Sequence, residues 1–412
     1  MVVRSPVSSQ CLAGHDRARH DALSRRAFSS ALGVSLISLP SHPAAAVQPQ
    51  RQEMAWRDGW QDLDLTNQHI VTRVEINSVP CLAIVDSGAQ RSVIRPDFAE
   101  KLQLKAIRQV AAVTFTQVIE GSLFEVNSLK FGKFIFNKVD MSSYHISDAQ
   151  YLMPEEVMVI IGMDILHGIV LDIDFVDRKM RIGERLDIQN ADKFRMEKFE
   201  VLETGLPTMK IALEAAAYVA AVDLGNSAPI LISGEFAEQR GLFDARPTST
   251  AMSVGAEGSS IDRIFSARTV RFVGHEMRDV PIRSISNWQF PVPLVIGWQF
   301  FRAFYAIFDF ITHRGFFRAS QNALSTSFPK DRSGLGVQRF ADHLLVSHVA
   351  AGSPAWRAGI QPGDAIVELD DVPVGPDNPK PGVKLGQLPA GSKIKLGLSS
   401  GRQVILVLKD YF

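Results

Sequence analysis

Cysteine is scarce in this sequence, and neither sign of charge is in excess. Only Cys11 and Cys81 occur in 412 residues, which excludes a disulfide framework, and no Cys/His spacing is typical of a zinc site. Lysine plus arginine and aspartate plus glutamate number 44 each, so the chain lacks the positive charge by which proteins bind nucleic acid or anionic membranes. No glycine-rich phosphate loop or Ser-His-Asp order stands out. We therefore expect no metal, no cofactor and no nucleic-acid partner.

Long apolar runs are also missing near the N-terminus. Arg25 and Arg26 precede Phe28 and a short apolar run at 31–39, and small residues follow at 44–46. This run is too short to span a bilayer, which needs about 20 residues. Residues 1–46 resemble a bacterial twin-arginine export signal, which predicts a periplasmic protein with no membrane span after cleavage. The alternatives are an ordinary secretory signal and a short membrane anchor.

The rest of the chain contains an internal repeat of about 137 residues. The length of the whole chain, 412 residues, favours two or three domains, and a hydrophobic content of 46% is enough for a large core. Both copies have an apolar strand, then Asp-x-Gly, then a second apolar run. The Asp-x-Gly turns are Asp86-Ser87-Gly88-Ala89 in the first copy and Asp223-Leu224-Gly225-Asn226 in the second.

Three landmarks recur in the same order in both copies. Gly162 follows Asp86 by 76 residues, and Gly297 follows Asp223 by 74, each at the end of an apolar run. An Asp-Phe pair comes twelve residues after each of these glycines. Asp-x-Gly alone is an ordinary turn motif, but recurrence of the whole pattern indicates a duplication.

Short β-rich runs punctuated by glycine, proline and asparagine separate the landmarks. They are typical of strands and hairpins, and the only short helices we expect here are at 96–104 and 234–241. Each copy is therefore expected to be a small β-lobe, the first at 47–190 and the second at 191–320.

The repeat resembles the aspartic peptidases, and in particular the retropepsin-like group. Asp86-Ser87-Gly88-Ala89 is similar to the active-site turn of that family, and residues 160–166 are similar to its later strand-to-helix element. The resemblance implies two facing lobes, fused in one chain as in pepsin-like enzymes, with Asp86 and Asp223 as the catalytic pair. Gly88 and Gly225 would let the two turns bend sharply and approach each other.

A pair of carboxyls can hydrolyse a peptide bond without a metal. Because two adjacent carboxylates cannot both ionise easily, one remains a base that activates water while the other remains an acid. The resemblance therefore implies an aspartic endopeptidase that acts on polypeptides. Its family covers the substrate with one hairpin from each lobe, and glycines predict hairpin tips at Gly121 and at 255–258. Ordinary surface hairpins would show the same glycines.

The second copy departs from the family pattern. A hydroxyl residue usually follows each catalytic aspartate and braces the two turns; Ser87 keeps it, but Leu224 cannot donate a hydrogen bond. Asn226 also replaces the usual small residue. The alternative hypothesis is therefore that Asp223 is a turn aspartate in a structural lobe, and that the protein is a catalytically inactive peptide-binding or scaffold protein.

After a polar linker at 321–332, residues 333–412 resemble a PDZ domain. The resemblance rests on a Gly-Leu-Gly-Val turn at 334–337 and on a Gly-Ser-Pro-Ala and Gly-Asp pattern at 352–364. In that family the turn binds the C-terminal carboxylate of a peptide, which adds a strand to the sheet edge. Leu335, Gly336 and Val337 would form this carboxylate loop. The alternative is a domain used only for packing or oligomerisation. The expected fold class is thus mainly β, with two β-lobes of the aspartic protease fold followed by a PDZ-like domain.

Overall fold

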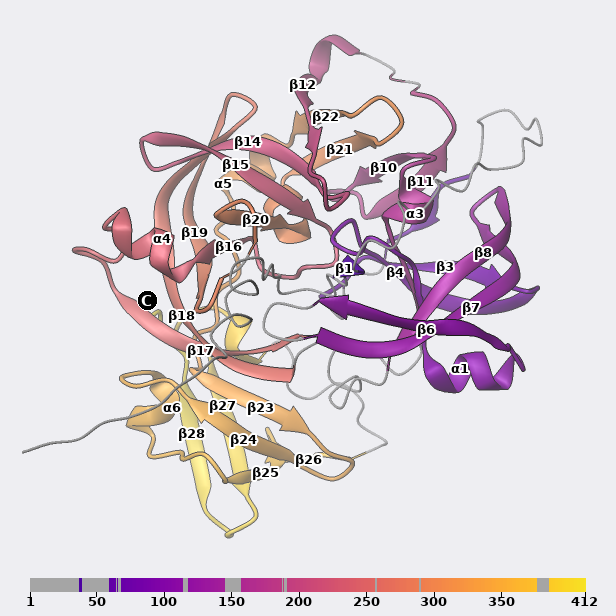
Figure 1. Ribbon diagram of the computed structural model, residues 1–412. Helices are drawn as coiled ribbons and strands as arrows, with labels where there is room; N and C mark the ends of the chain where they lie inside the picture. The colour runs from indigo at the N-terminus through magenta and orange to yellow at the C-terminus, as the bar shows by residue number, and fades with distance from the viewer. Residues whose placement is uncertain are drawn as a thin grey trace, which may run out of the picture.

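The computed structural model describes residues 37–38, 59–63, 65, 68–113, 118–144, 157–186, 188, 191–255, 258–288, 290–375 and 385–412. These residues form four β-sheets with a few short helices, so the fold is mainly β, as the sequence predicts (Figure 1). Among them, no helix is both long and apolar enough to cross a membrane. Nearly all of the predicted export signal lies outside the described residues, so export stays a prediction.

The first lobe is built on an eight-stranded sheet. In spatial order its strands are β1 (Ile37–Ser38), β6 (Ala106–Val113), β7 (Val118–Phe131), β3 (Val71–Ile76), β4 (Val79–Val85), β9 (Val157–Ile161), β5 (Val93–Ile94) and β8 (Phe134–Tyr144). The helix α1 (Pro96–Lys101) has proline in its first turn, where no amide donor is needed, and it buries Phe98. The short helix α3 (Met163–Leu166) follows β9 directly.

The second lobe is built on another eight-stranded sheet. In spatial order its strands are β13 (Glu200–Val201), β14 (Pro207–Leu213), β15 (Ala216–Asp223), β20 (Leu294–Gly297), β16 (Ile230–Ser233), β19 (His275–Ile285), β18 (Gly258–Phe272) and β17 (Thr248–Gly255). The helix α4 (Gly234–Gln239) begins at Ser233, whose hydroxyl accepts the amide of Phe236, and η2 (Trp298–Phe301) follows β20. Both predicted helices, α1 and α4, are thus present.

The two lobes share one topology. In the first lobe β4 pairs in parallel with β9, which pairs on its other side antiparallel with β5. In the second lobe β15 pairs in parallel with β20, which pairs antiparallel with β16. The sequence repeat is therefore a structural repeat, and each Asp-x-Gly turn comes at the end of a central, buried strand.

A six-stranded sheet joins the two lobes. Its strands are β12 (Arg195–Lys198), β22 (Arg314–Ala319), β21 (Phe304–Asp309), β10 (Val170–Asp174), β11 (Lys179–Gly183) and β2 (Gln61–Asp62), with η1 (Ala191–Lys193) before β12. β10 from the first lobe pairs antiparallel with β21 from the second. One apolar cluster contains buried residues of both lobes, including the stacked rings of Phe175 from the first lobe and Phe301 from the second. This shared core fixes the two Asp-x-Gly turns relative to each other.

The C-terminal domain has its own sheet and its own core. Its strands are β23 (Leu335–Arg339), β24 (Leu344–Val349), β25 (Ala365–Leu369), β26 (Val372–Pro373), β27 (Lys393–Leu398) and β28 (Gln403–Val407), with α6 (Pro354–Arg357) and η3 (Leu385–Gln387). The predicted linker contains a short helix, α5 (Gln321–Ser325). Beyond it, buried Lys330 forms a 2.7 Å ion pair with Asp279 of the second lobe, which ties the domain to that lobe.

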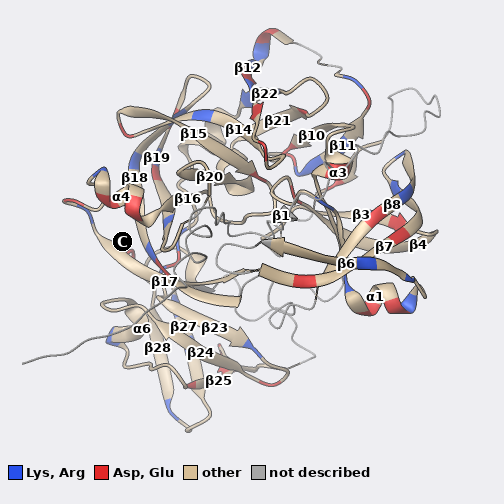
Figure 2. Cartoon of the chain, viewed as in Figure 1, with Lys and Arg blue, Asp and Glu red and all other residues tan. Residues whose placement is uncertain are grey.

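Lysine and arginine residues alternate with aspartate and glutamate residues over both lobes and the C-terminal domain, without one large region of either charge (Figure 2). Several pair with an opposite charge on a neighbouring strand, such as Lys130 with Glu75 at 2.6 Å. Such exposed pairs contribute little to stability, about 0–1 kcal/mol each. The apolar cores, rather than these pairs, hold the fold together.

The flap hairpins of the two lobes are only partly where the sequence predicts them. In the first flap, β6 and β7 stay paired from Ala106 with Phe124 to Val113 with Val118, and Gly121 pairs with Val110, so the predicted tip at Gly121 is wrong. Gly121 lies within β7, where a Cβ atom would come within 2.2 Å of the Ser143 carbonyl oxygen and 2.5 Å of the Tyr144 ring. The second flap, β17 and β18, turns at 255–258, as predicted.

Candidate active site

Asp86 and Asp223 are held by the same hydrogen bonds in the two lobes. Asp86 follows β4, and its Oδ1 accepts the amides of Gly88 and Ala89 at 2.7 and 3.1 Å. Asp223 ends β15, and its Oδ1 accepts the amides of Gly225 and Asn226 at 3.0 and 3.1 Å. Each turn therefore fixes one carboxyl oxygen and leaves the other oxygen available.

The two carboxyls lie against each other and are buried. Asp86 is 0% exposed and Asp223 is 2% exposed. No amide or hydroxyl among the described residues donates to Oδ2 of Asp86, and the carboxyl of Asp223 lies close enough to act on the charge of Asp86. Two carboxyl oxygens can share a hydrogen bond only when one carboxyl is protonated. Burial, followed by the charge of Asp223, raises the pKa of Asp86 well above its usual range.

Gly225 makes this approach possible. A Cβ atom at Gly225 would lie 2.3 Å from the carboxyl carbon of Asp86 and 2.5 Å from each of its oxygens. The glycine predicted to let the turns approach is therefore the residue on which the Asp86 carboxyl rests. No other residue type leaves room there.

Ser87 supplies a hydroxyl brace between the two turns. Its hydroxyl donates to the carbonyl oxygen of Val222 at 2.8 Å and accepts the amide of Leu224 at 3.0 Å. Ser87 and Leu224 are both fully buried. Leu224 thus offers no hydroxyl, as the sequence predicts, but its backbone amide makes one of the two hydrogen bonds of Ser87.

Asn226 stabilises its own turn. Its Oδ1 accepts the amide of Ala228 at 2.9 Å, and its carbonyl oxygen accepts the amide of Trp298 at 3.0 Å. In the first lobe, Ala89 occupies the matching place, and its carbonyl oxygen accepts the amide of Met163 at 2.7 Å. The departure from a small residue therefore leaves the geometry of the second turn intact.

Replacement of Ser87 by alanine is expected to destabilise the fold by about 2 kcal/mol or more, because a buried amide and a buried carbonyl both lose their partner. Denaturant unfolding of the purified chain measures this free energy. Ser399→Ala, which alters an exposed serine, is the matched control and is expected to change stability by less than about 0.5 kcal/mol. Equal stability of the two variants would contradict the assigned brace.

Contacts that the sequence did not reveal also tie the second turn to the first lobe. His69 Nδ1 lies 3.1 Å from the carbonyl oxygen of Gly225, which fits the tautomer that carries its proton on Nδ1. Next to it, the carbonyl oxygen of Gln68 accepts the indole N–H of Trp298 at 2.7 Å. In the opposite direction, the Gln90 amide donates to the carbonyl oxygen of Thr204. No local motif marks these residues, since their partners lie more than a hundred positions away.

The buried carboxyl of Asp164 holds the segment that follows the first turn. Asp164 Oδ1 accepts the Ser92 amide and the Ser92 hydroxyl, both at 2.8 Å, and Ser92 Oγ accepts the amide of Gly162 at 3.0 Å. Burial raises the pKa of Asp164 to about 6, although the Ser92 hydrogen bonds oppose this shift. The second lobe has Pro229 and Gln299 at the matching positions, so this support is specific to the first lobe.

The raised pKa of Asp164 predicts a pH-dependent stability. The folded chain binds this proton more tightly than the unfolded chain does, so the contribution is complete below about pH 4 and is lost as the pH rises through about 6. Asp164→Asn keeps an acceptor oxygen but cannot titrate. We expect its free energy of unfolding to fall less across this interval than that of the wild type, by about 2 kcal/mol.

Chemical denaturation at several pH values measures this difference. Asp177→Asn, in an exposed turn, is the control and should follow the wild-type curve. A parallel course for the Asp164→Asn and wild-type curves would contradict the assignment.

The described residues offer little alternative chemistry. They contain no group of three or more His, Cys, Asp or Glu side chains that could hold a metal ion. Cys81 lies on β4, and burial raises the pKa of its thiol to about 11, which keeps it protonated at neutral pH. It is therefore a structural thiol rather than a nucleophile.

The predicted carboxylate loop lies at the start of β23, the edge strand of the C-terminal sheet. Gly334 has a positive φ of 77°, and its amide donates to Asp331 Oδ2 at 2.7 Å. The amide of Leu335 donates to the Ser333 hydroxyl at 3.1 Å, so a peptide carboxylate would compete with that hydroxyl. Gly336 and Val337 continue into the strand beside β24.

Two family models match parts of the chain. The sequence matches the aspartyl protease family at residues 72–165 and the PDZ domain family at 345–398. The chain therefore contains an aspartyl protease domain and a PDZ domain. The first match includes the turn of Asp86 but ends before Asp223, and the second begins after the carboxylate loop. The structure is similar to basic 7S globulin from soybean, with a TM-score of 0.39 and 9% identity over 65% of this chain and 96% of that chain. Comparison with curated proteins gives no match.

Proposed function

We propose that this protein is an aspartic endopeptidase. One observation carries the proposal: two copies of the same turn bury Asp86 and Asp223 close enough together that the charge of Asp223 adds to burial in raising the pKa of Asp86, so the pair is suited to hold one proton. A pair of turn aspartates in a purely structural lobe would have no reason to meet in a buried place, because burying two carboxyls side by side costs free energy.

The proposed reaction follows from the single proton on the pair. The ionised carboxyl accepts a proton from water as the water oxygen attacks the peptide carbonyl carbon, and the protonated carboxyl donates to the carbonyl oxygen. The tetrahedral intermediate then collapses: its C–N bond breaks, the leaving nitrogen takes up a proton from the pair, and one hydroxyl of the intermediate gives its proton to the other carboxyl as the new carbonyl forms. The carboxyls return to one proton between them, so no other reactant is consumed.

We also propose that the PDZ domain binds the free C-termini of polypeptides. The loop at 334–337 and the position of β23 at the edge of the sheet that the described residues form support this, because an extended peptide can add to such an edge. An exported, periplasmic enzyme would fit the twin-arginine-like sequence at 1–46. Fractionation of cells that express the full chain tests the location.

Hydrolysis of a denatured protein mixture, measured from about pH 3 to about pH 8, tests the peptidase. We expect peptides to appear at acidic pH and hydrolysis to stop once the shared proton is lost. The competing hypothesis, an inactive binding protein, is favoured only by Leu224, which leaves one brace instead of two. C-terminal peptides that bind while nothing is cleaved at any pH would establish that alternative.

A further inference from the structure

One strand of the second flap touches both the PDZ domain and the first lobe. Successive side chains of a strand point to opposite faces, so Thr250, Met252 and Val254 of β17 share a face. β17 is the edge strand of its sheet and lies over β23 and β24 of the PDZ domain (Figure 1). The middle of the strand therefore lies on one domain, and its end reaches another.

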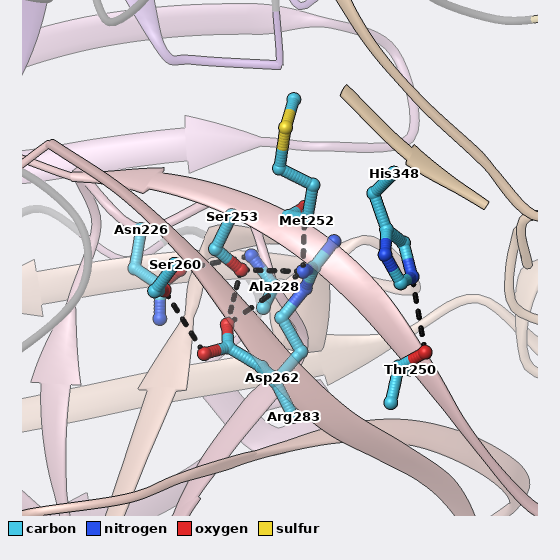
Figure 3. A network of polar contacts seen from close by, with 9 residues as sticks. All are labelled: Asn226, Ala228, Thr250, Met252, Ser253, Ser260, Asp262, Arg283 and His348. Atoms are coloured by element: carbon cyan, nitrogen blue, oxygen red, sulfur yellow. Dashed lines mark hydrogen bonds and ion pairs between the residues drawn. The ribbon is translucent and has the colours of Figure 1, made fainter. Parts of the chain in front are cut away.

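Two contacts join β17 to the PDZ domain. Thr250 Oγ1 lies 3.0 Å from His348 Nε2, within hydrogen-bonding distance (Figure 3). Met252 lies on Gly336, where a Cβ atom would come within 2.7 Å of the Met252 Cβ. Gly336 and His348 are direct cross-strand partners, so both contacts involve the same face of the β23–β24 pair. Gly336 is also the middle residue of the predicted carboxylate loop.

The end of the same strand rests on the first lobe. Val254 packs against a first-lobe cluster that contains Ala89, from the turn of Asp86, and Ala112, from the first flap. Val254 therefore links the second flap both to the turn of Asp86 and to the first flap.

The opposite face of β17 is stiffened by a polar network. The Ser253 hydroxyl and the Ser260 hydroxyl both donate to the buried carboxylate of Asp262, the latter at 3.0 Å. Arg283 donates to Ser253 Oγ at 2.5 Å and to the carbonyl oxygen of Met252 at 3.2 Å (Figure 3). These bonds tie β17 to β18 and β19, so residues 250–254 move as one unit rather than one by one.

We propose that the PDZ domain clamps the second flap shut, and that a peptide with a free C-terminus and an aliphatic last residue opens the clamp. This inference rests on the proposed peptidase function, since it concerns access to that site. The peptide carboxylate binds the loop at Gly336 in competition with Met252, and the released strand withdraws Val254 from the first lobe. The apolar side chains of Leu335 and Val337, packed on the PDZ core, suit an aliphatic residue.

Thermodynamic linkage fixes what must be observed. If the peptide binds the open flap more tightly than the closed flap, then peptide shifts the flap towards the open state. By the same linkage, a substitution that raises the open population by a given factor raises the affinity for the peptide by up to that factor. Loss of one hydrogen bond and one apolar contact predicts a factor of about five or more.

The test compares Thr250→Val/Met252→Ala with Thr248→Val, which changes the same residue type on the same face of β17. Hydrogen exchange of the β17 amides is measured in full-length chains that also carry Asp86→Asn, so that no hydrolysis interferes. The ligand is a decapeptide that ends in valine with a free carboxylate, and its carboxamide is the control. Hydrolysis rates are measured separately with the catalytic aspartates intact.

We expect the double variant to exchange its β17 amides about fivefold faster, to hydrolyse protein about fivefold faster, and to bind the decapeptide about fivefold more tightly. The free peptide should produce the same exchange in the wild-type flap, whereas the carboxamide and Thr248→Val should change nothing. Unchanged exchange in the double variant, slower hydrolysis, or no binding of the decapeptide overturns the clamp. Coupled exchange in a chain that hydrolyses nothing would overturn the peptidase and leave the clamp standing.

Discussion

Replacement of Asp86 or of Asp223 by asparagine is each expected to reduce hydrolysis about 10³-fold or more. Asparagine keeps the size of the side chain and one acceptor oxygen, so the turn amides remain bonded. It cannot accept or donate the proton that the two carboxyls share. Because the pair works as a unit, either substitution alone should remove nearly all activity, and the double variant should be little worse. Release of peptides from denatured protein at acidic pH measures the loss.

The matched control is Asp309→Asn, which alters a buried aspartate outside the catalytic pair. Asp309 Oδ1 accepts the amide of Thr312 at 3.0 Å, which asparagine can accept as well, whereas the contacts of Oδ2 with the Thr312 hydroxyl and with Arg314 are weakened, so the variant loses some stability but no member of the aspartate pair. Activity should therefore survive in this variant. Loss with Asp86→Asn but not with Asp223→Asn would mean that one aspartate acts without the other, and the shared proton would be the wrong description.

The sequence predicts the architecture well because a duplication repeats its own landmarks. The spacing from Asp86 to Gly162 is nearly that from Asp223 to Gly297, and the structure explains this regularity. In each lobe the aspartate and the glycine lie at the ends of two strands that pair in parallel. The described residues between them form the same series of strands with one short helix in both lobes, so the number of residues from aspartate to glycine is nearly the same. The helices α1 and α4 follow from the same repeat.

Prediction from the sequence fails for residues whose role depends on a contact with a residue distant in the sequence. Gly121 was predicted to mark a turn, but it is a strand glycine that lets Tyr144 of β8 lie close, and such an approach leaves no local signal. Leu224 correctly indicated a missing hydroxyl. That Ser87 makes both remaining bonds, and that His69 reaches the carbonyl oxygen of Gly225, depends on how the lobes meet.

Gly225→Ala is expected to reduce hydrolysis at least about 100-fold, because the new methyl group would lie 2.3 Å from the carboxyl carbon of Asp86. No flexible side-chain end can yield there: the obstacle is the carboxyl of Asp86, which the amides of Gly88 and Ala89 hold in place. The two turns must separate, and the carboxyls then cease to share a proton. Hydrolysis rates and the free energy of unfolding are measured together, and overpacking should cost about 1–3 kcal/mol.

Gly375→Ala is the matched control, since a Cβ atom there would meet nothing within 4 Å. This control should leave the hydrolysis rate and the free energy of unfolding unchanged, so any loss in Gly225→Ala comes from the contact with the Asp86 carboxyl rather than from replacing a glycine in general.

The pH dependence of Gly225→Ala distinguishes an effect on catalysis from an effect on folding. Once the turns separate, the charge of Asp223 acts less on Asp86, so the alkaline limit of any remaining activity should move to lower pH. A Gly225→Ala chain that keeps full activity would show that the two carboxyls need not touch, and the shared-proton mechanism would fall with that result.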